Sequence, residues 1–88
     1  MDSLDLVEKV MMIEEFFGNE IPNENFSSPR EIVDWLEAHL SNQRPNKEAA
    51  TFLRKLAKRY DNPELAEGLT GTWRRDQIAA VIREIFRE

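Results

Sequence analysis

The sequence predicts an all-α protein, a small four-helix bundle, and three observations lead to this fold class. Apolar residues recur every three or four positions in four separate segments, which is the spacing of an amphipathic helix. No segment alternates apolar and polar residues with period two, as a half-buried strand would. Proline, glycine and asparagine stand between the apolar segments, where they favour connections between helices.

The first helix is expected over residues 4–17. Ser3 is a favourable N-cap, and the carboxylate of Asp5 in the first turn interacts favourably with the positive end of the helix dipole. Gly18 is expected to end the helix. Apolar residues follow helical spacing, with Glu14 the polar exception among them, at Val7, Val10, Met11, Ile13 and Phe17.

The second helix is expected over residues 29–41, after a polar connection that contains Pro22. Ser28 and Pro29 form a typical helix start, with serine as the N-cap and proline in the first helical position. Ile21 and Phe26 are the apolar residues of the connection, and we expect both to reach the core. The apolar face of this helix is expected to comprise Ile32, Val33, Trp35, Leu36 and Leu40.

Two longer helices and a short one are expected in the rest of the chain. Asn46 is a suitable cap for a helix over residues 47–60, and Pro63 starts a short helix that Gly68 stops. Thr72 is expected to cap a last helix that runs nearly to the terminus. Its apolar residues are Trp73, Ile78, Val81, Ile82, Ile85 and Phe86.

Composition excludes several kinds of chemistry. The chain has no cysteine, so disulfides, thiolate metal sites and cysteine nucleophiles are excluded. Its longest uncharged apolar run is far shorter than the roughly 20 residues that span a bilayer, and an acid rather than a basic signal region follows Met1. We therefore expect no membrane insertion, no export and a cytoplasmic location.

Charge is divided unevenly along the chain. Residues 1–43 contain ten acids and two bases, whereas residues 44–88 contain ten bases and seven acids. The acidic half disfavours nucleic-acid binding and suits docking onto basic patches of partner proteins, although a solvated acidic helix face would explain it equally well. The basic residues of 54–59 and 73–75 lack a nucleic-acid-binding motif, and we expect them to pair with the acidic half.

One stretch of the chain resembles a known family. The run Asp2-Ser3-Leu4-Asp5-Leu6-Val7-Glu8, with the apolar positions that follow it, resembles the second helix of acyl carrier proteins, which bears the prosthetic arm. Glu20-Ile21-Pro22 resembles the segment after that helix, and Ile32-Val33-Asp34-Trp35-Leu36 resembles the family's fourth helix. The resemblance covers residues 2–40 in order, and this combination is more specific than the tripeptide Asp-Ser-Leu alone.

The resemblance implies a carrier rather than an enzyme. A phosphopantetheinyl transferase would attach a 4'-phosphopantetheine arm to Ser3, with Asp2 and Leu4 completing the attachment motif. Acyl groups would travel as thioesters on the arm in fatty-acid, polyketide or related lipid biosynthesis. Acyl-processing enzymes would dock on a helix surface formed by Asp5, Glu8, Met11, Glu14 and Glu15. The interior that could shelter an acyl chain, or serve simply as the core, would be lined by Val7, Ile13, Phe17, Ile21, Phe26, Val33 and Leu36.

The resemblance divides the single domain 1–88 into a carrier-like core, 1–43, and a C-terminal helical extension, 44–88. The family's first helix would precede Ser3, whereas this sequence begins at Met1, so the resemblance implies either a rearranged carrier or a fragment or alternative start of a longer carrier protein. Residues 73–86 (WRRDQIAAVIREIF) resemble that first helix in charge and apolar spacing. We therefore hypothesise that the last helix occupies the vacated place, as in a circular permutation, in a protein that we expect to be monomeric.

Two other functional classes remain open on the sequence. The first is a helical protein–protein interaction module, derived from a carrier, that bears no arm. The second is an enzyme, which we disfavour because no general base or oxyanion hole is near Ser3 in sequence. His39 is the only histidine and has no metal-ligand spacing around it, so we expect it to face solvent.

Overall fold

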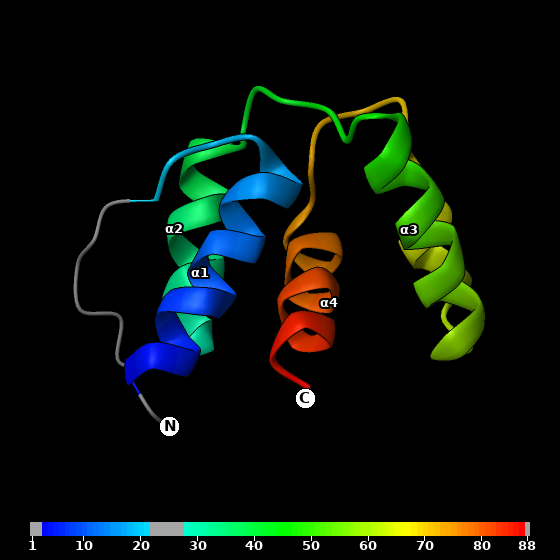
Figure 1. Ribbon diagram of the computed structural model, residues 1–88. Helices are drawn as coiled ribbons and strands as arrows, with labels where there is room; N and C mark the ends of the chain where they lie inside the picture. The colour runs from blue at the N-terminus through cyan, green and yellow to red at the C-terminus, as the bar shows by residue number, and fades with distance from the viewer. Residues whose placement is uncertain (1–2, 22–27, 88) are drawn as a thin grey trace.

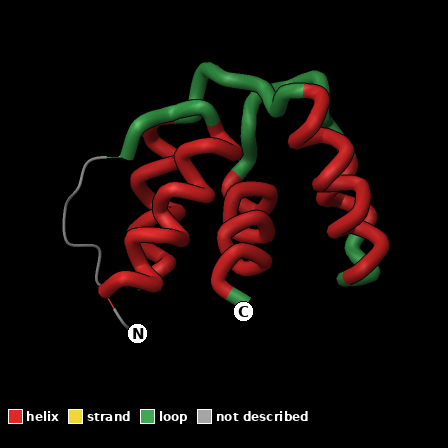
Figure 2. The backbone as a smooth tube through the Cα atoms, in the orientation of Figure 1, coloured by secondary structure: helices red, strands yellow, loops and turns green. Residues whose placement is uncertain are grey.

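The computed structural model describes residues 3–21 and 28–87, with the backbone alone for residues 3–6. Its elements are the helices α1 (Ser3–Phe17), α2 (Pro29–His39), α3 (Lys47–Arg59) and α4 (Arg75–Phe86), and the 3₁₀ helix η1 (Pro63–Ala66). Figures 1 and 2 show these helices joined by loops, and the described ranges contain no strand. The prediction of a small all-α bundle is confirmed.

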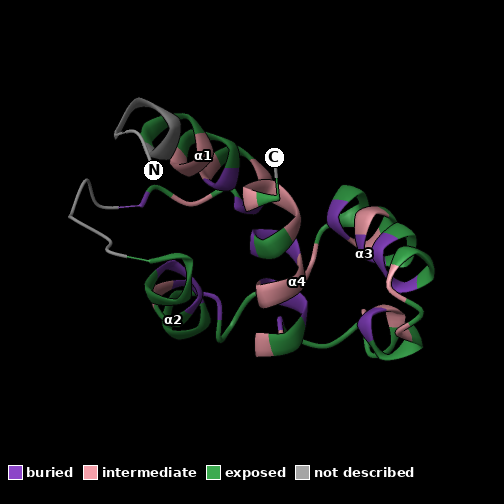
Figure 3. Ribbon diagram, turned by 90° about the horizontal axis from the view of Figure 1, so that it is seen from below, coloured by how far each residue is buried: buried purple, intermediate pink, exposed green. Residues whose placement is uncertain are grey.

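Helix α4 occupies the centre of the bundle. It contacts α1, α2, α3 and η1, and the view along the helices places it between α1 and α2 on one side and α3 on the other (Figure 3). Phe17, at the end of α1, packs on Trp73, just before α4 begins, so these two helices are antiparallel. Arg75, at the start of α4, pairs with Glu37 near the end of α2, which makes this pair antiparallel as well.

One hydrophobic cluster joins all of these elements. Ile13 of α1, Ile32 of α2 and Ile78 of α4 are fully buried in it, together with Leu53 of α3. Both halves of the sequence therefore supply the same core. Each half alone would expose the apolar residues that now cover one another, and apolar burial is the largest favourable contribution to folding.

Four aromatic rings connect α1 to the C-terminal half. Phe16 and Phe17 of α1 make an edge-on pair, and Phe16 makes a second edge-on contact with Phe52 of α3 at 5.3 Å between ring centroids. Trp73 completes the cluster, with its ring centroid 4.8 Å from that of Phe17 and its side chain buried. Such aromatic pairs add stability beyond the area that they bury.

The predicted helix ends are close to the observed ones. Helix α1 includes Ser3 in its first turn instead of using it as a cap, and α2 ends at His39 rather than at residue 41. Gly18 ends α1 in a left-handed conformation, with φ of 70°, and its N–H donates to the carbonyl of Glu14. Because this region of φ disfavours residues with a β-carbon, glycine suits the position.

The two predicted serine and asparagine caps behave differently. Asn46 caps α3 as expected, since its side-chain oxygen accepts a hydrogen bond from the N–H of Ala49 at 2.8 Å. Ser28 has the extended backbone of an N-cap before α2, but its side chain makes no capping hydrogen bond. The first turn of α2 is instead started by Pro29, whose fixed φ suits that position.

The predicted cap of the last helix, Thr72, is wrong. Helix α4 begins after Arg74, whose N–H donates to the side-chain oxygen of Gln77 at 3.0 Å. Trp73 lies outside the helix, and its N–H donates to the carbonyl of Gln43 at 2.9 Å. That tertiary hydrogen bond fixes the chain before α4 in an extended conformation, so the helix starts later than local sequence indicates.

Among the described residues, Arg75 of the basic half pairs with acids of the acidic half. Arg75 contacts Asp34 at 2.6 Å and Glu37 at 2.9 Å, as we expected for residues 73–75. Arg59 and Arg74 correct the expectation, because their partners in the described residues are Glu84 and Asp76 of the basic half.

Glu84 of α4 contacts several polar side chains at the ends of α3 and α4. It accepts hydrogen bonds from the Tyr60 hydroxyl and from Arg59, and Arg87 lies 3.8 Å away. The hydrogen bond from Tyr60 is the largest cause that holds the pKa of Glu84 below its ordinary value, and the two arginine charges act in the same direction. This cluster joins the carboxyl ends of α3 and α4, which makes the two helices parallel.

Candidate functional site

The predicted attachment residue, Ser3, lies at the amino end of α1. Its backbone is helical, and this end of α1 is at the same end of the bundle as the start of α2 and the end of α4 (Figure 1). Asp2 lies outside the described residues, and the side chains of Leu4 and Asp5 are not described. The role of this motif therefore stays a prediction.

One face of α1 is open to solvent and combines apolar with acidic side chains. Met11 is 55% exposed, Val7 49% and Met12 48%, and the side chains of Glu8 and Glu15 are exposed beside them. Positions 7, 8, 11, 12 and 15 recur at helical spacing, so they share one surface. We call this surface the α1 face.

The α1 face agrees with part of the predicted docking surface and corrects part of it. Glu8, Met11 and Glu15 are exposed, as a docking role requires. Val7 was expected in the interior, and that prediction is wrong. It shares its side of the helix with Met11, whereas Ile13 points into the core from the other side.

Glu14 also departs from its predicted docking role. It is half-buried, and its carboxylate accepts a hydrogen bond from the N–H of Ile21 at 2.8 Å. This hydrogen bond holds the segment that follows α1 against the helix, and Ile21 is buried in the core. Sequence reasoning missed this role because its partner is a backbone group beyond a turn.

The predicted interior is confirmed at five positions. Ile13, Phe17, Ile21, Val33 and Leu36 are buried, whereas Phe26 lies outside the described residues. These five side chains belong to the single hydrophobic cluster that α4 and α3 complete. They serve as the core of the whole bundle.

His39 faces solvent, as predicted. Its ring stacks on Trp35 with centroids 3.7 Å apart, and its Nδ1 atom lies 2.8 Å from the carbonyl oxygen of Trp35. Across the described ranges, no three side chains of histidine, aspartate or glutamate gather in a way that could hold a metal ion. None of the described helices is long and apolar enough to cross a membrane.

Comparisons with known proteins returned no match, either to models of protein families or to solved structures. The class of protein that the fold and the site define is a small helical bundle with an acidic and apolar helix face. Any more specific function is inferred from the chain's own residues.

Proposed function

We propose that this protein is an acyl carrier that holds acyl groups as thioesters on a 4'-phosphopantetheine arm attached to Ser3. The observation that carries the proposal is the α1 face, which begins within two helical turns of Ser3 and combines exposed acids with Met11. Such a face suits brief, salt-sensitive contacts with basic surfaces of several enzymes. Methionine side chains adapt to different partner surfaces because they are flexible and polarizable.

The attachment chemistry requires little of the protein itself. The Ser3 hydroxyl would attack the phosphorus of coenzyme A that bears the pantetheine, forming a phosphodiester and releasing 3',5'-ADP. The transferase would accept the serine proton and hold the nucleotide. The carrier must only present Ser3 beside a surface that the transferase can bind. The position of Ser3 at the start of α1, next to the α1 face, suits this presentation.

The packing of α4 supports a rearranged carrier bundle. Helix α4 contacts both α1 and α2 and runs antiparallel to both. In our proposal, residues 73–86 take the place that the resemblance assigns to the family's first helix. Had α4 been remote from α1, this arrangement would have been excluded.

Intact mass spectrometry tests the proposal directly. The full chain is incubated with a broad-specificity phosphopantetheinyl transferase and coenzyme A, alongside Ser3→Ala and the control Ser41→Ala. Ser41 is also exposed, but it follows α2 rather than starting α1. We expect one added phosphopantetheine in the wild type and in Ser41→Ala, and none in Ser3→Ala. An unmodified wild type that is helical by circular dichroism would contradict the proposal.

Transfer kinetics test the docking role of the α1 face. Met11→Ala and Glu8→Gln should lower the kcat/KM of transfer, and added salt should lower it further in the wild type. Glu48→Gln is the matched control, because Glu48 is an exposed acid on α3 rather than on α1. If all three variants are modified equally fast, the α1 face is not the docking surface.

A second candidate function is an interaction module without an arm. The exposure of Val7 and Met12 favours it, because exposed apolar side chains beside acids can serve a partner protein that needs no prosthetic group. Wild-type chain that stays unmodified by the transferase while folded would select this candidate.

A further inference from the structure

The outward surface of α3 is basic. Lys47, Arg54 and Lys58 recur at helical spacing opposite the buried side of the helix, and all three residues are exposed. None of them forms a salt bridge to a described residue. Thr51 lies among them and is exposed, and Ala50 beside them is half-buried. We call the surface of these five residues the α3 face.

The α1 face and the α3 face are both open to solvent, on helices that lie on either side of α4 (Figure 3). Within one molecule, α1 and α3 contact each other through Phe16 and Phe52, which belong to neither face. The two faces therefore do not cover each other in the fold, and each is available to another molecule.

The two faces match in spacing and are opposite in charge. Each has two charged residues seven positions apart, with two uncharged residues at the third and fourth positions after the first. These residues are Glu8, Met11, Met12 and Glu15 on α1, and Lys47, Ala50, Thr51 and Arg54 on α3. Seven residues advance about 10.5 Å along an α-helix, so two ion pairs can form at once when such faces meet.

We propose that the α1 face of one copy of this protein binds the α3 face of a second copy. The two helices run antiparallel, which places the carboxyl end of α1 beside the amino end of α3 and opposes their dipoles. Glu15 then pairs with Lys47 of the other copy. Glu8 pairs with its Arg54. This contact needs neither Ser3 nor an arm, and it replaces the monomer expected from the sequence with reversible self-association.

Side-chain size also suits this contact. Met11 and Met12 are long, flexible and exposed, whereas the residues opposite them are small. Of these, Thr51 donates its hydroxyl proton to the carbonyl of Lys47 at 3.0 Å, so covering it leaves this donor paired. An apolar contact is therefore flanked by an ion pair at each end.

The α3 face suits this partner better than a membrane or a nucleic acid. Among the described residues, the exposed large apolar side chains are Val7, Met11 and Met12, all on α1. The α3 face therefore has none to insert into a lipid surface. A net charge of −5 and an acidic α1 disfavour the approach of a nucleic acid.

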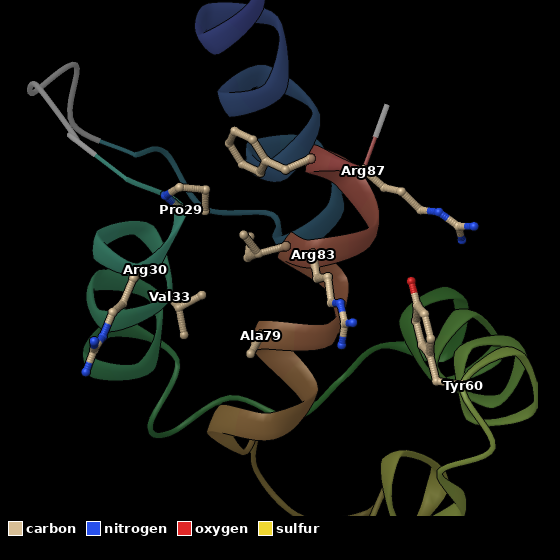
Figure 4. Close-up of a pocket in the computed structure, with 9 residues that line it drawn as sticks. Pro29, Arg30, Val33, Tyr60, Ala79, Arg83 and Arg87 are labelled. Carbon is tan, nitrogen blue, oxygen red and sulfur yellow. The ribbon is translucent and has the colours of Figure 1, made fainter. Parts of the chain in front are cut away.

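The arginines around the open groove between α2 and α4 do not form a comparable face. Figure 4 shows Arg30 directed away from the groove, on the opposite side from Arg83. The guanidinium of Arg83 lies over the Tyr60 ring, 5.2 Å from its centroid. These cations therefore do not match two acids that are spaced along one helix.

Sedimentation equilibrium measures the self-association of the full chain. A contact between two helix faces is smaller than a standard interface of roughly 800 Å² per partner, so we expect a dissociation constant of about 0.1–1 mM. Because the two faces differ, a bound copy still offers a free face to a third copy, and the mean mass should rise beyond that of a dimer. Added salt should weaken the association.

Exchange of charge between the faces tests the pairing. Glu8→Lys/Glu15→Lys and Lys47→Glu/Arg54→Glu should each associate at least about tenfold more weakly than the wild type. An exposed ion pair contributes up to about fivefold to the association constant, and each double variant makes two pairs repulsive. An equimolar mixture of the two variants should associate like the wild type, since each α1 face then meets an α3 face of opposite charge.

Glu20→Lys/Glu67→Lys is the matched control. It changes the net charge as much as the α1 variant does, at exposed acids that lie outside both faces. It should associate no more weakly than the wild type. Far-ultraviolet circular dichroism should show that every variant keeps its helices, because the substituted side chains are exposed.

Amide shifts during dilution of the wild type locate the contact, and we expect them at residues 7–15 and 47–58. A wild type that stays monomeric at about 1 mM would overturn the inference. So would reversed variants that associate like the wild type, a mixture that does not recover association, or shifts on α1 without shifts on α3. Binding of anionic vesicles or of nucleic acid to the α3 face without self-association would overturn it as well. Each outcome is separate from the transferase assay, which measures modification of Ser3.

Discussion

Trp73→Ala should destabilise the whole bundle, although Trp73 lies in a connection rather than in a helix. Its side chain is buried and packs on the ring of Phe17 at 4.8 Å and on that of Phe16 at 6.3 Å. These contacts fasten the start of α4 to the end of α1. Truncation would leave a cavity where both halves of the sequence meet.

The expected loss in the free energy of unfolding is large compared with the total. Replacing a buried tryptophan by alanine costs about 3–5 kcal/mol, and this includes the aromatic pairs at about 0.5–1.5 kcal/mol each. A chain of 88 residues has a total stability of roughly 4–13 kcal/mol. Trp73→Ala should therefore remove about a quarter or more of the total stability, whereas Trp73→Phe, which keeps one ring, should lose about 1–2 kcal/mol.

Urea unfolding followed by far-ultraviolet circular dichroism measures both losses without depending on tryptophan fluorescence. Trp35→Ala is the matched control, because Trp35 is half-buried and stacks on the exposed ring of His39. It should cost about 1 kcal/mol. If Trp73→Ala costs no more than Trp35→Ala, the aromatic cluster does not hold the two halves together and our account of the fold fails.

Three further predictions concern a cap, an acid and the α1 face. Asn46→Ala should lower the free energy of unfolding by about 1 kcal/mol in urea titrations, whereas Ser28→Ala, which removes no capping hydrogen bond, should change it by a few tenths at most. Because the pKa of Glu84 is lowered in the folded state, its contribution to stability is present above the unfolded pKa and is lost as pH falls through the folded pKa. Melts at a series of acidic pH values should therefore show a shallower loss of stability in Glu84→Gln than in the wild type, and equal slopes would refute this. Met11→Lys should leave the free energy of unfolding within about 0.5 kcal/mol of the wild type while slowing the transferase; a clear loss of stability would mean that Met11 belongs to the core.

Several site features could be predicted from sequence because they depend on local spacing. The exposure of Glu8 and Glu15 follows from acids spaced at helical intervals. The role of Glu14 could not be predicted, because its partner, the N–H of Ile21, becomes available only when the chain turns back after α1.

The sequence by itself determined the helices, because apolar spacing, Asn46, Pro29 and Gly18 act within a few residues of their own positions. It did not determine which side of α1 is buried. Apolar residues surround much of that helix, and only packing against α4 separates Ile13 inside from Val7 and Met11 outside. The tertiary structure alone decided the central place of α4 and its start after Arg74. Both depend on contacts between segments that are far apart in the chain. Local sequence patterns do not reveal the free energy of such contacts.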